Sequence, residues 1–264
     1  MELIDTHCHL DDDVFENDLP AVLDHARETG VRRFINIGYE PASWERTLAL
    51  ANQDSAISYA LGMHPNSADL WSSETKAALT MLLEREHPVA IGETGLDYFR
   101  EHADHDAQRQ AFRDQLDLAR RFRLPVVIHM RGDVEHDIVG VLGDFPDVRT
   151  ILHSFDGSAG LRDFLLERGD SFGVGGLMTR AGSAELRAVL RSVPLESIVL
   201  ETDSPYLAPK GIKDRRNTPA SVAIVAAALA DLIGKDIADI AKITTQNALS
   251  VFGLARAAVV GGTT

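Results

Sequence analysis

Short apolar segments rich in β-branched residues recur eight times along this chain, and a longer stretch with helical periodicity follows each of them. The predicted strands are Leu3–Asp5, Arg33–Ile37, Ser58–Leu61, Val89–Gly92, Val126–His129, Thr150–His153, Ser171–Gly173 and Ser197–Glu201. The predicted helices between and after them are Glu16–Thr29, Ser43–Asn52, Ser73–Glu86, Asp106–Phe122, Val134–Leu142, Ser158–Arg168, Ala184–Ser192 and Pro219–Gly234. This alternation predicts parallel βαβ units. Eight units with almost continuously apolar strands favour closure into an α/β (β/α)₈ barrel, the TIM barrel, over an open doubly wound sheet.

The length of the chain fits one such barrel. It has 264 residues, and an α/β barrel typically takes about 250. No Gly/Pro/Ser-rich linker divides it, and Ile237–Leu254 reads as a last helix. We therefore expect a single barrel domain over residues 1–254 and a flexible C-terminal tail over residues 255–264.

Charge and composition narrow the classes of function. A net charge of -14 is unfavourable for a protein that wraps nucleic acid with a broad basic face, although bound cations can reverse the charge inside a pocket. The single cysteine, Cys8, excludes an internal disulfide. The N-terminus has no signal-peptide pattern, and the longest apolar run, Val222–Ala230, is too short to span a bilayer. We expect a cytoplasmic enzyme without a membrane partner.

Histidines and acids recur at the ends of the predicted strands. His7 and His9 come just after the first strand, and side chains at positions i and i+2 of an extended segment point the same way. Other polar residues end or follow the fourth, fifth, sixth and eighth strands: Glu93, His129, His153 and Asp203. The C-terminal ends of barrel strands meet at one face, where TIM-barrel active sites are built. We therefore expect these six side chains to lie together.

Four imidazoles and two carboxylates in one place indicate a metal centre. Without a metal, several of these polar groups would be buried without a partner. Six ligands suit two divalent cations about 3.5–4 Å apart better than one, and Glu93 has two oxygens with which to bridge them. Imidazole and carboxylate ligands suit Zn²⁺ or Mn²⁺ and similar ions, and Mg²⁺ less well.

Cations near the same face suggest a phosphate-bearing substrate. The loop Lys210–Arg216 holds four basic residues, among them Arg215, and Arg131 comes two residues after His129. Guanidinium groups suit bidentate contact with phosphate. His64, after the third strand in Gly62-Met63-His64-Pro65, lies at the same predicted face and can donate a hydrogen bond to substrate.

At these residues the sequence resembles the TatD family of metal-dependent deoxyribonucleases, within the amidohydrolase-like metallo-barrels. The segments that carry the resemblance are Asp5–Leu10, Gly62–Pro65, Ile91–Tyr98, Leu124–His129, His153–Gly157 and Leu200–Leu207. The resemblance implies a TIM barrel with two divalent cations, one held by His7, His9, Glu93 and Asp203 and the other by Glu93, His129 and His153. It also implies hydrolysis of DNA phosphodiesters, often as a 3′→5′ exonuclease on single strands. Asn66, Met130 and Ser154 stand where the family often has other residues, which bears on substrate preference and leaves every expected ligand in place.

The expected chemistry is attack on a phosphodiester by a metal-activated water. Asp203 is the candidate general base. Glu93, which can bridge the two metals, is the second candidate catalytic residue. Arg131 and Arg215 are predicted to hold phosphates, Tyr98 or Phe99 to stack on a terminal base, and Glu201 to support a ligating histidine. Packing of the barrel against a helix is an equally good interpretation of the aromatic pair.

Two alternatives remain open at this point. A small-molecule amidohydrolase, lactonase, esterase or deaminase can use the same binuclear site, although such sites commonly bridge their metals with a carboxylated lysine. None of the five lysines ends the fourth predicted strand, where Glu93 stands instead. A non-catalytic barrel that only binds metal is the other alternative, and the complete ligand set argues against it.

Overall fold

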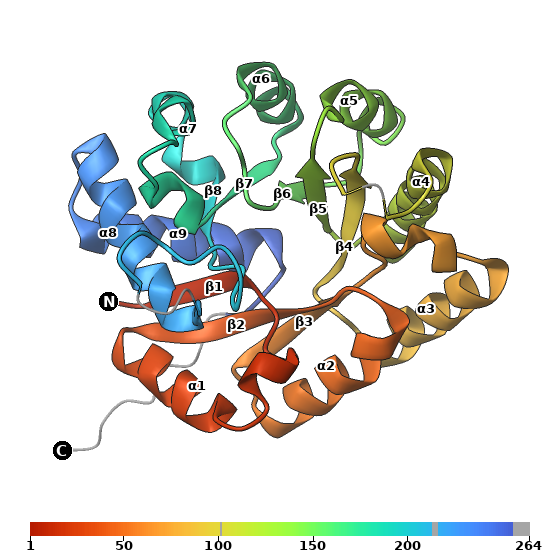
Figure 1. The fold of residues 1–264 in the computed structure, drawn as a ribbon, viewed down its shortest axis with the longest axis horizontal. Helices are drawn as coiled ribbons and strands as arrows, with labels where there is room; N and C mark the ends of the chain where they lie inside the picture. Colours follow the sequence, from red (N-terminus) through yellow and green to blue (C-terminus); the bar gives the residue numbers. More distant parts are fainter. Residues whose placement is uncertain (101, 213–215, 256–264) are drawn as a thin grey trace.

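Figure 1 shows the strands of the protein side by side as a barrel, with helices around the outside. The computed structural model describes residues 1–100, 102–212 and 216–255. The strands are β1 (Leu3–Cys8), β2 (Val31–Gly38), β3 (Ile57–Leu61), β4 (Ala90–Asp97), β5 (Val126–Arg131), β6 (Thr150–Leu152), β7 (Ser171–Val174) and β8 (Ile198–Leu200). The α-helices are α1 (Leu19–Glu28), α2 (Pro41–Gln53), α3 (Ser73–Glu86), α4 (His105–Phe122), α5 (Glu135–Gly143), α6 (Ala159–Arg168), α7 (Ala184–Leu190), α8 (Val222–Ile233) and α9 (Ile237–Val251). Short 3₁₀ helices are η1 (Asp13–Phe15), η2 (Pro65–Leu70), η3 (Gly176–Thr179), η4 (Leu195–Ser197) and η6 (Pro219–Ser221).

The eight strands pair in chain order and all neighbours are parallel. The ring closes between the segment after β8 and the end of β1, where Cys8 and Ser204 form a parallel bridge. Two backbone hydrogen bonds of 2.8 Å secure this closure, from the N–H of Asp203 to the carbonyl of His7 and from the N–H of His9 to the carbonyl of Ser204. The expected single (β/α)₈ barrel is confirmed.

The inside of the barrel is a separate apolar cluster, distinct from the larger one between the strands and the helices. Ile4, Ile35 and Val127 contribute to it from different strands. At the N-terminal end of the barrel, Leu249 and Phe252 from the α9 region pack onto this cluster and close it. Helix α9 therefore closes the barrel interior at its N-terminal end, and the C-terminal end is where TIM-barrel active sites are built.

Strand β4 is longer than the sequence predicts. It was expected to stop at Gly92, but it continues to Asp97, so that Glu93 lies within the strand. A Cβ atom on Gly92 would lie 2.6 Å from the carbonyl oxygen of Val127, and one on Gly95 would lie 2.1 Å from that of His129. These glycines therefore allow β4 to approach β5 closely, whereas the sequence pattern interprets glycine as a strand end.

Two further findings concern the ends of the chain and the membrane. Ala255 is exposed and its carbonyl accepts a hydrogen bond of 2.8 Å from Arg33. The rest of the predicted C-terminal tail, residues 256–264, lies outside the described residues. Within the described ranges, no helix is long and apolar enough to span a membrane.

Candidate metal centre

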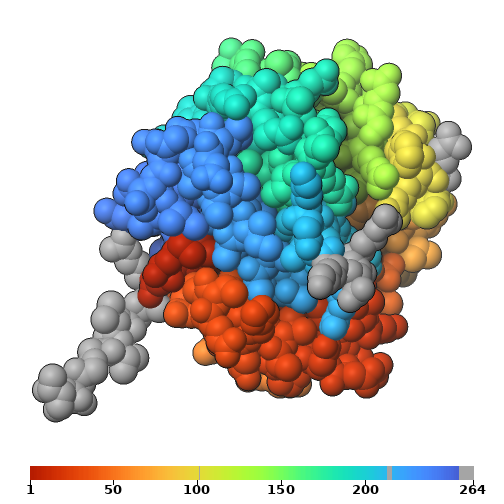
Figure 2. Space-filling view, turned by 60° about the vertical axis from the view of Figure 1, so that its left-hand side comes forward, coloured from red at the N-terminus to blue at the C-terminus, as the bar shows by residue number. Residues whose placement is uncertain are grey.

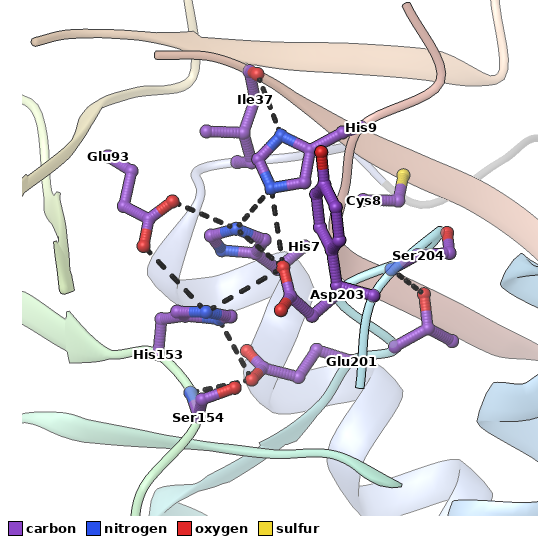
Figure 3. Close-up of polar contacts among 12 residues, drawn as sticks. His7, Cys8, His9, Ile37, Glu93, His153, Ser154, Glu201, Asp203 and Ser204 are labelled. Atoms are coloured by element: carbon purple, nitrogen blue, oxygen red, sulfur yellow. Dashed lines mark hydrogen bonds and ion pairs between the residues drawn. The ribbon is translucent and has the colours of Figure 1, made fainter. Parts of the chain in front are cut away.

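The six histidines and acids predicted as ligands meet at the C-terminal end of the barrel, and Figure 3 shows His7, His9, Glu93, His153 and Asp203 of this set. They are His7 in β1, His9 just after it, Glu93 in β4, His129 in β5, His153 after β6 and Asp203 after β8. All but His129 are buried, and the His129 side chain is 16% exposed. The barrel closure described above fixes the backbone of three of them, because His7, His9 and Asp203 take part in its hydrogen bonds.

One half of the cluster surrounds the Nε2 atom of His7. This atom lies 3.3 Å from Nε2 of His9, 3.4 Å from Oε2 of Glu93 and 3.7 Å from Oδ1 of Asp203. His9 Nε2 lies 3.3 Å from the same Asp203 oxygen. Two ligand atoms, each about 2.1 Å from one cation at a tetrahedral angle, are about 3.4 Å apart. The spacing therefore fits a shared cation.

The other half of the cluster surrounds the second oxygen of Glu93. Oε1 of Glu93 lies 2.7 Å from Nδ1 of His129 and 3.7 Å from Nε2 of His153. Glu93 thus presents Oε2 to His7 and Oε1 to His129. This is the arrangement by which a carboxylate joins two cation sites.

An oxygen atom lies close to the outward-facing nitrogen of His9 and of His153. Nδ1 of His9 lies 3.3 Å from the carbonyl of Ile37, and Nδ1 of His153 lies 3.0 Å from Oε1 of Glu201. A proton on Nδ1 in each ring leaves the lone pair of Nε2 directed into the cluster, which is the tautomer that a metal ligand needs. The predicted support from Glu201 is in a position to fix His153.

His129 has an equivalent partner that sequence reasoning missed. Its Nε2 lies 3.3 Å from Oδ2 of Asp97, which leaves Nδ1 for the cluster. Asp97 is fully buried, and its Oδ1 accepts hydrogen bonds of 3.0 Å from the N–H groups of Phe99 and Arg100. The predicted β4 ended before Asp97, so nothing in that prediction directed this acid toward the barrel. The signal available in the sequence was Asp97 itself, an acid that ends a second short glycine-containing segment after Glu93.

His64 carries its proton on the other ring nitrogen from His9 and His153. Its Nδ1 accepts a hydrogen bond of 3.0 Å from the N–H of Asn66, so in the neutral ring the proton is on Nε2. That Nε2 lies 3.2 Å from Nδ1 of His129. Burial, together with the neighbouring His129, lowers the pKa of His64 to about 3. His64 is therefore a neutral hydrogen-bond donor at the edge of the cluster.

The charges of the cluster favour a bound cation. Burial alone would raise the pKa of Glu93, but His153 and His7 outweigh it and hold that pKa well below its usual value. Burial would lower the pKa of His153, but Glu201, Glu93 and Asp203 raise it to about 10. Acids that stay ionised while buried need positive charge beside them. Protons on the histidines can supply this charge. A divalent cation bound to the same ring nitrogens would supply more positive charge.

Two aromatic residues follow Asp97, and they differ in their contacts and in their exposure to solvent. The hydroxyl of Tyr98 donates a hydrogen bond of 2.6 Å to Asp137, and its ring stacks on His105 at 3.6 Å between centroids. Phe99 is 66% exposed, and the Arg131 guanidinium lies 4.4 Å from the centre of its ring. Tyr98 is thus engaged within the protein, whereas Phe99 and Arg131 form an exposed pair beside the cluster.

In the basic loop after β8, the structure describes residues 210–212 and 216. Arg216 is engaged with Asp18 through hydrogen bonds of 2.6 and 2.8 Å, and its NH2 also donates to the carbonyl of Val14. Lys210 is exposed. Residues 213–215, which include the predicted phosphate contact Arg215, lie outside the described residues.

Comparison with known proteins identifies the family of this chain. The family model of the TatD-related DNases matches residues 4–253. The chain belongs to this family. A TatD homologue from Escherichia coli K12, YjjV, has a solved structure that superimposes with a TM-score of 0.90 at 33% identity, over 96% of this chain and 98% of its own.

Curated relatives cover the TatD-family chain almost completely. The "uncharacterized metal-dependent hydrolase YabD" of Bacillus subtilis is 33% identical over 95% of this chain and 98% of its own. The "3'-5' ssDNA/RNA exonuclease TatD" of Erwinia amylovora is 33% identical over 96% of this chain and all of its own. The expected class, a metal-dependent hydrolase of ester bonds, is confirmed by this membership. An organophosphorus hydrolase from Deinococcus radiodurans shares the fold alone, with 14% identity and a TM-score of 0.63.

Proposed function

We propose that this TatD-family hydrolase cleaves phosphodiester bonds of DNA and removes nucleotides from the 3′ end of single strands. The observation that carries the proposal is the position of Glu93, which presents one carboxylate oxygen to each of two sets of ligand atoms. Two metals held in this way are a recurrent solution for phosphodiester cleavage. The printed name of the Erwinia amylovora relative supports the choice of substrate and direction.

The proposed ligand assignment is the one that the family resemblance implies, and His153 Nε2 lies between the two halves of the cluster, 3.7 Å from Oε1 of Glu93 and 3.8 Å from Oδ1 of Asp203. In the proposal, one cation is held by His7, His9, Glu93 and Asp203. The other is held by Glu93, His129 and His153. When bound, such cations, whether Mn²⁺, Zn²⁺ or Mg²⁺, supply an activated water and polarise the phosphoryl group. The acceptors of His9, His129 and His153 keep the rings in the tautomer that this role requires.

Asp203 is proposed as the general base. Burial would raise its pKa, but His153, His9 and His7 hold the pKa below its usual value, so the carboxylate is ionised at neutral pH. Its Oδ1 faces the imidazoles, and a carboxylate has a second oxygen that can accept a proton from the attacking water. The Asp203 side chain is 12% exposed, which gives this second oxygen access to the mouth of the site.

Substrate is proposed to meet three groups at the rim. His64 donates its Nε2–H to a phosphoryl oxygen, because its Nδ1 is already occupied by the Asn66 N–H. Arg131 forms no ion pair with a carboxylate of the described residues, so its guanidinium is available for a second phosphate. Phe99, rather than Tyr98, stacks on the terminal base, since its ring is exposed and Tyr98 is engaged with Asp137 and His105.

The test is cleavage of single-stranded oligonucleotides labelled at the 3′ or the 5′ end. Protein reconstituted with Mn²⁺, Zn²⁺ or Mg²⁺ should release 3′-terminal nucleotides and leave a ladder of 5′-labelled products. EDTA and Glu93→Ala should each abolish the ladder. Glu167→Ala, which removes an exposed glutamate from α6, should leave it unchanged. Absence of cleavage by protein that holds two metals would contradict the proposal and favour a small ester or amide as substrate.

A further inference from the structure

A second cavity lies at the opposite end of the barrel from the metal centre. Its volume is about 580 Å³, within the range of small-molecule sites. It is bounded by the starts of β1 and β2 and by one face of α9, and it has an apolar floor of Leu3, Ile4 and Leu249. Figure 2 shows the N-terminal residues, in red, at the surface against the blue C-terminal helices. From Leu3 to His7 along β1 is about 13 Å at the usual rise of a strand, so the two sites do not overlap.

Three of the α9 residues that line the cavity have small side chains. Ala238, Ala241 and Thr245 line it and are spaced as i, i+3 and i+7, which places them on one face of the helix. Larger apolar residues on this face would fill the space and gain contacts with the strands. The small side chains therefore leave space between α9 and the strands that a ligand could occupy.

The charges around the cavity are the second observation. Three cations line it, Arg32, Arg33 and Lys242, against one acid, Glu2. None of the three forms an ion pair with a carboxylate of the described residues. Other arginines of the described residues, such as Arg109, Arg120 and Arg168, have an acidic partner, so the cations of this cavity remain available to an anionic ligand.

Arg33 is the most informative of the three. It has the same strand parity as Ile35 and Ile37, which belong to the cluster inside the barrel, and it is half-buried. Its NH2 donates to the carbonyl of Ala255, which satisfies part of a guanidinium that has five N–H donors, and no carboxylate of the described residues pairs with its charge. Partial burial weakens the hydration of this positive charge, which favours an anionic partner.

We propose that this cavity binds a small amphipathic anion. A phosphate or carboxylate head lies between Arg33, Arg32 and Lys242, and the apolar body of the ligand covers Leu3, Ile4 and Leu249. The charge complementarity selects an anion, and the apolar floor excludes inorganic phosphate as a tight ligand. A nucleoside monophosphate and a medium-chain fatty acid share this chemistry, and the experiment below separates them.

The test is a fluorescence titration of the full chain, stripped of metal with EDTA, with 1-anilinonaphthalene-8-sulfonate, an aromatic anion that brightens in apolar sites. We expect one saturable site. Arg33→Gln should weaken binding by about tenfold, the usual effect of one charge-assisted hydrogen bond. Ala238→Leu should also weaken it, because the exposed helix position tolerates leucine while the side chain fills the cavity. Arg191→Gln, at an exposed position after α7, is the matched control and should change affinity by less than about twofold.

Displacement of the probe then identifies the ligand class. Adenosine monophosphate, decanoate and inorganic phosphate are added to the saturated complex, and at least one of the first two should displace the probe at lower concentration than phosphate does. The proposal is overturned if the probe does not bind, if phosphate alone is as effective as both amphipathic anions, or if Arg191→Gln weakens binding as much as Arg33→Gln. Because the titration needs neither metal nor nucleic acid, its result is independent of the hydrolytic function.

Discussion

Asp97→Asn should weaken one metal site through the tautomer of a single histidine. The Oδ1 atom of Asp97 accepts two backbone N–H groups, from Phe99 and Arg100. An asparagine at this position must keep its carbonyl oxygen there to satisfy them. Its NH₂ group then faces Nε2 of His129, where the carboxylate oxygen lies at 3.3 Å in the native protein. Two donors cannot bond to each other, so His129 is expected to move its proton to Nδ1, the atom that faces Glu93.

The expected magnitude is that of losing the partner of a ligating histidine, about 10- to 100-fold in metal affinity, or roughly 1.4 to 2.7 kcal/mol. Glu201→Gln is the instructive comparison. Oε1 of Glu201 serves both the N–H of Ser154 at 2.7 Å and His153 at 3.0 Å. A glutamine oxygen can serve both, so this variant retains the His153 tautomer and should lose less than about tenfold.

The assay is competition for Zn²⁺ or Mn²⁺ between the protein and a chromophoric chelator, which reports the affinity and number of sites. Asp97→Asn should show one site of native affinity and one weakened site, with an unchanged melting temperature for the metal-free protein taken as evidence of folding. The reasoning is refuted if Asp97→Asn binds both equivalents as tightly as the native protein. It is also refuted if Glu201→Gln is the more damaging substitution, because the tautomer would then not control affinity.

Three other outcomes are expected. Phe99→Ala should lower kcat/KM on a single strand by the value of one stacked base, about 1–3 kcal/mol, and have little effect on a strand whose terminal nucleotides are abasic; equal losses on both would rule out stacking. Arg168→Met should lower the free energy of unfolding, measured in urea, by about 3–5 kcal/mol, because it leaves Asp170 buried without the guanidinium that lies 2.6 Å away; a loss below about 1 kcal/mol would contradict this. Gly95→Ala should reduce metal binding, since its Cβ would lie 2.1 Å from a β5 carbonyl, whereas Gly143→Ala, with open space around it, should bind metal normally in the same titration.

The fold could be predicted because the pattern that defines it is local and repeated. Each βα unit shows its own switch from a short apolar segment to helical periodicity, and the eight strands occur in the predicted order. The convergence of His7, His129 and Asp203 follows from the same topology, since all parallel strands end at one face. Closure itself depends on a pairing between residues almost 200 positions apart, Cys8 and Ser204, which no local pattern contains.

The parts of the site that could not be predicted depend on hydrogen bonds across the barrel. Asp97 was missed because Gly92 and Gly95 resemble strand ends in the sequence, while in three dimensions they let β4 continue beside β5. Phe99 and Tyr98 are adjacent aromatic residues of similar character in the sequence. Only the partners of Tyr98 in α4 and α5 show which of the two is exposed. The tautomer of His64 is likewise set by a backbone N–H and not by its motif.

The central claim is a pair of cations joined by Glu93, and anomalous diffraction from crystals grown with Mn²⁺ tests it most directly. The account predicts two anomalous peaks about 3.5–4 Å apart at the C-terminal end of the barrel, with an oxygen of Glu93 bonded to each. One peak should contact His7, His9 and Asp203, and the other His129 and His153. A single peak, or two peaks of which only one contacts Glu93, would contradict it.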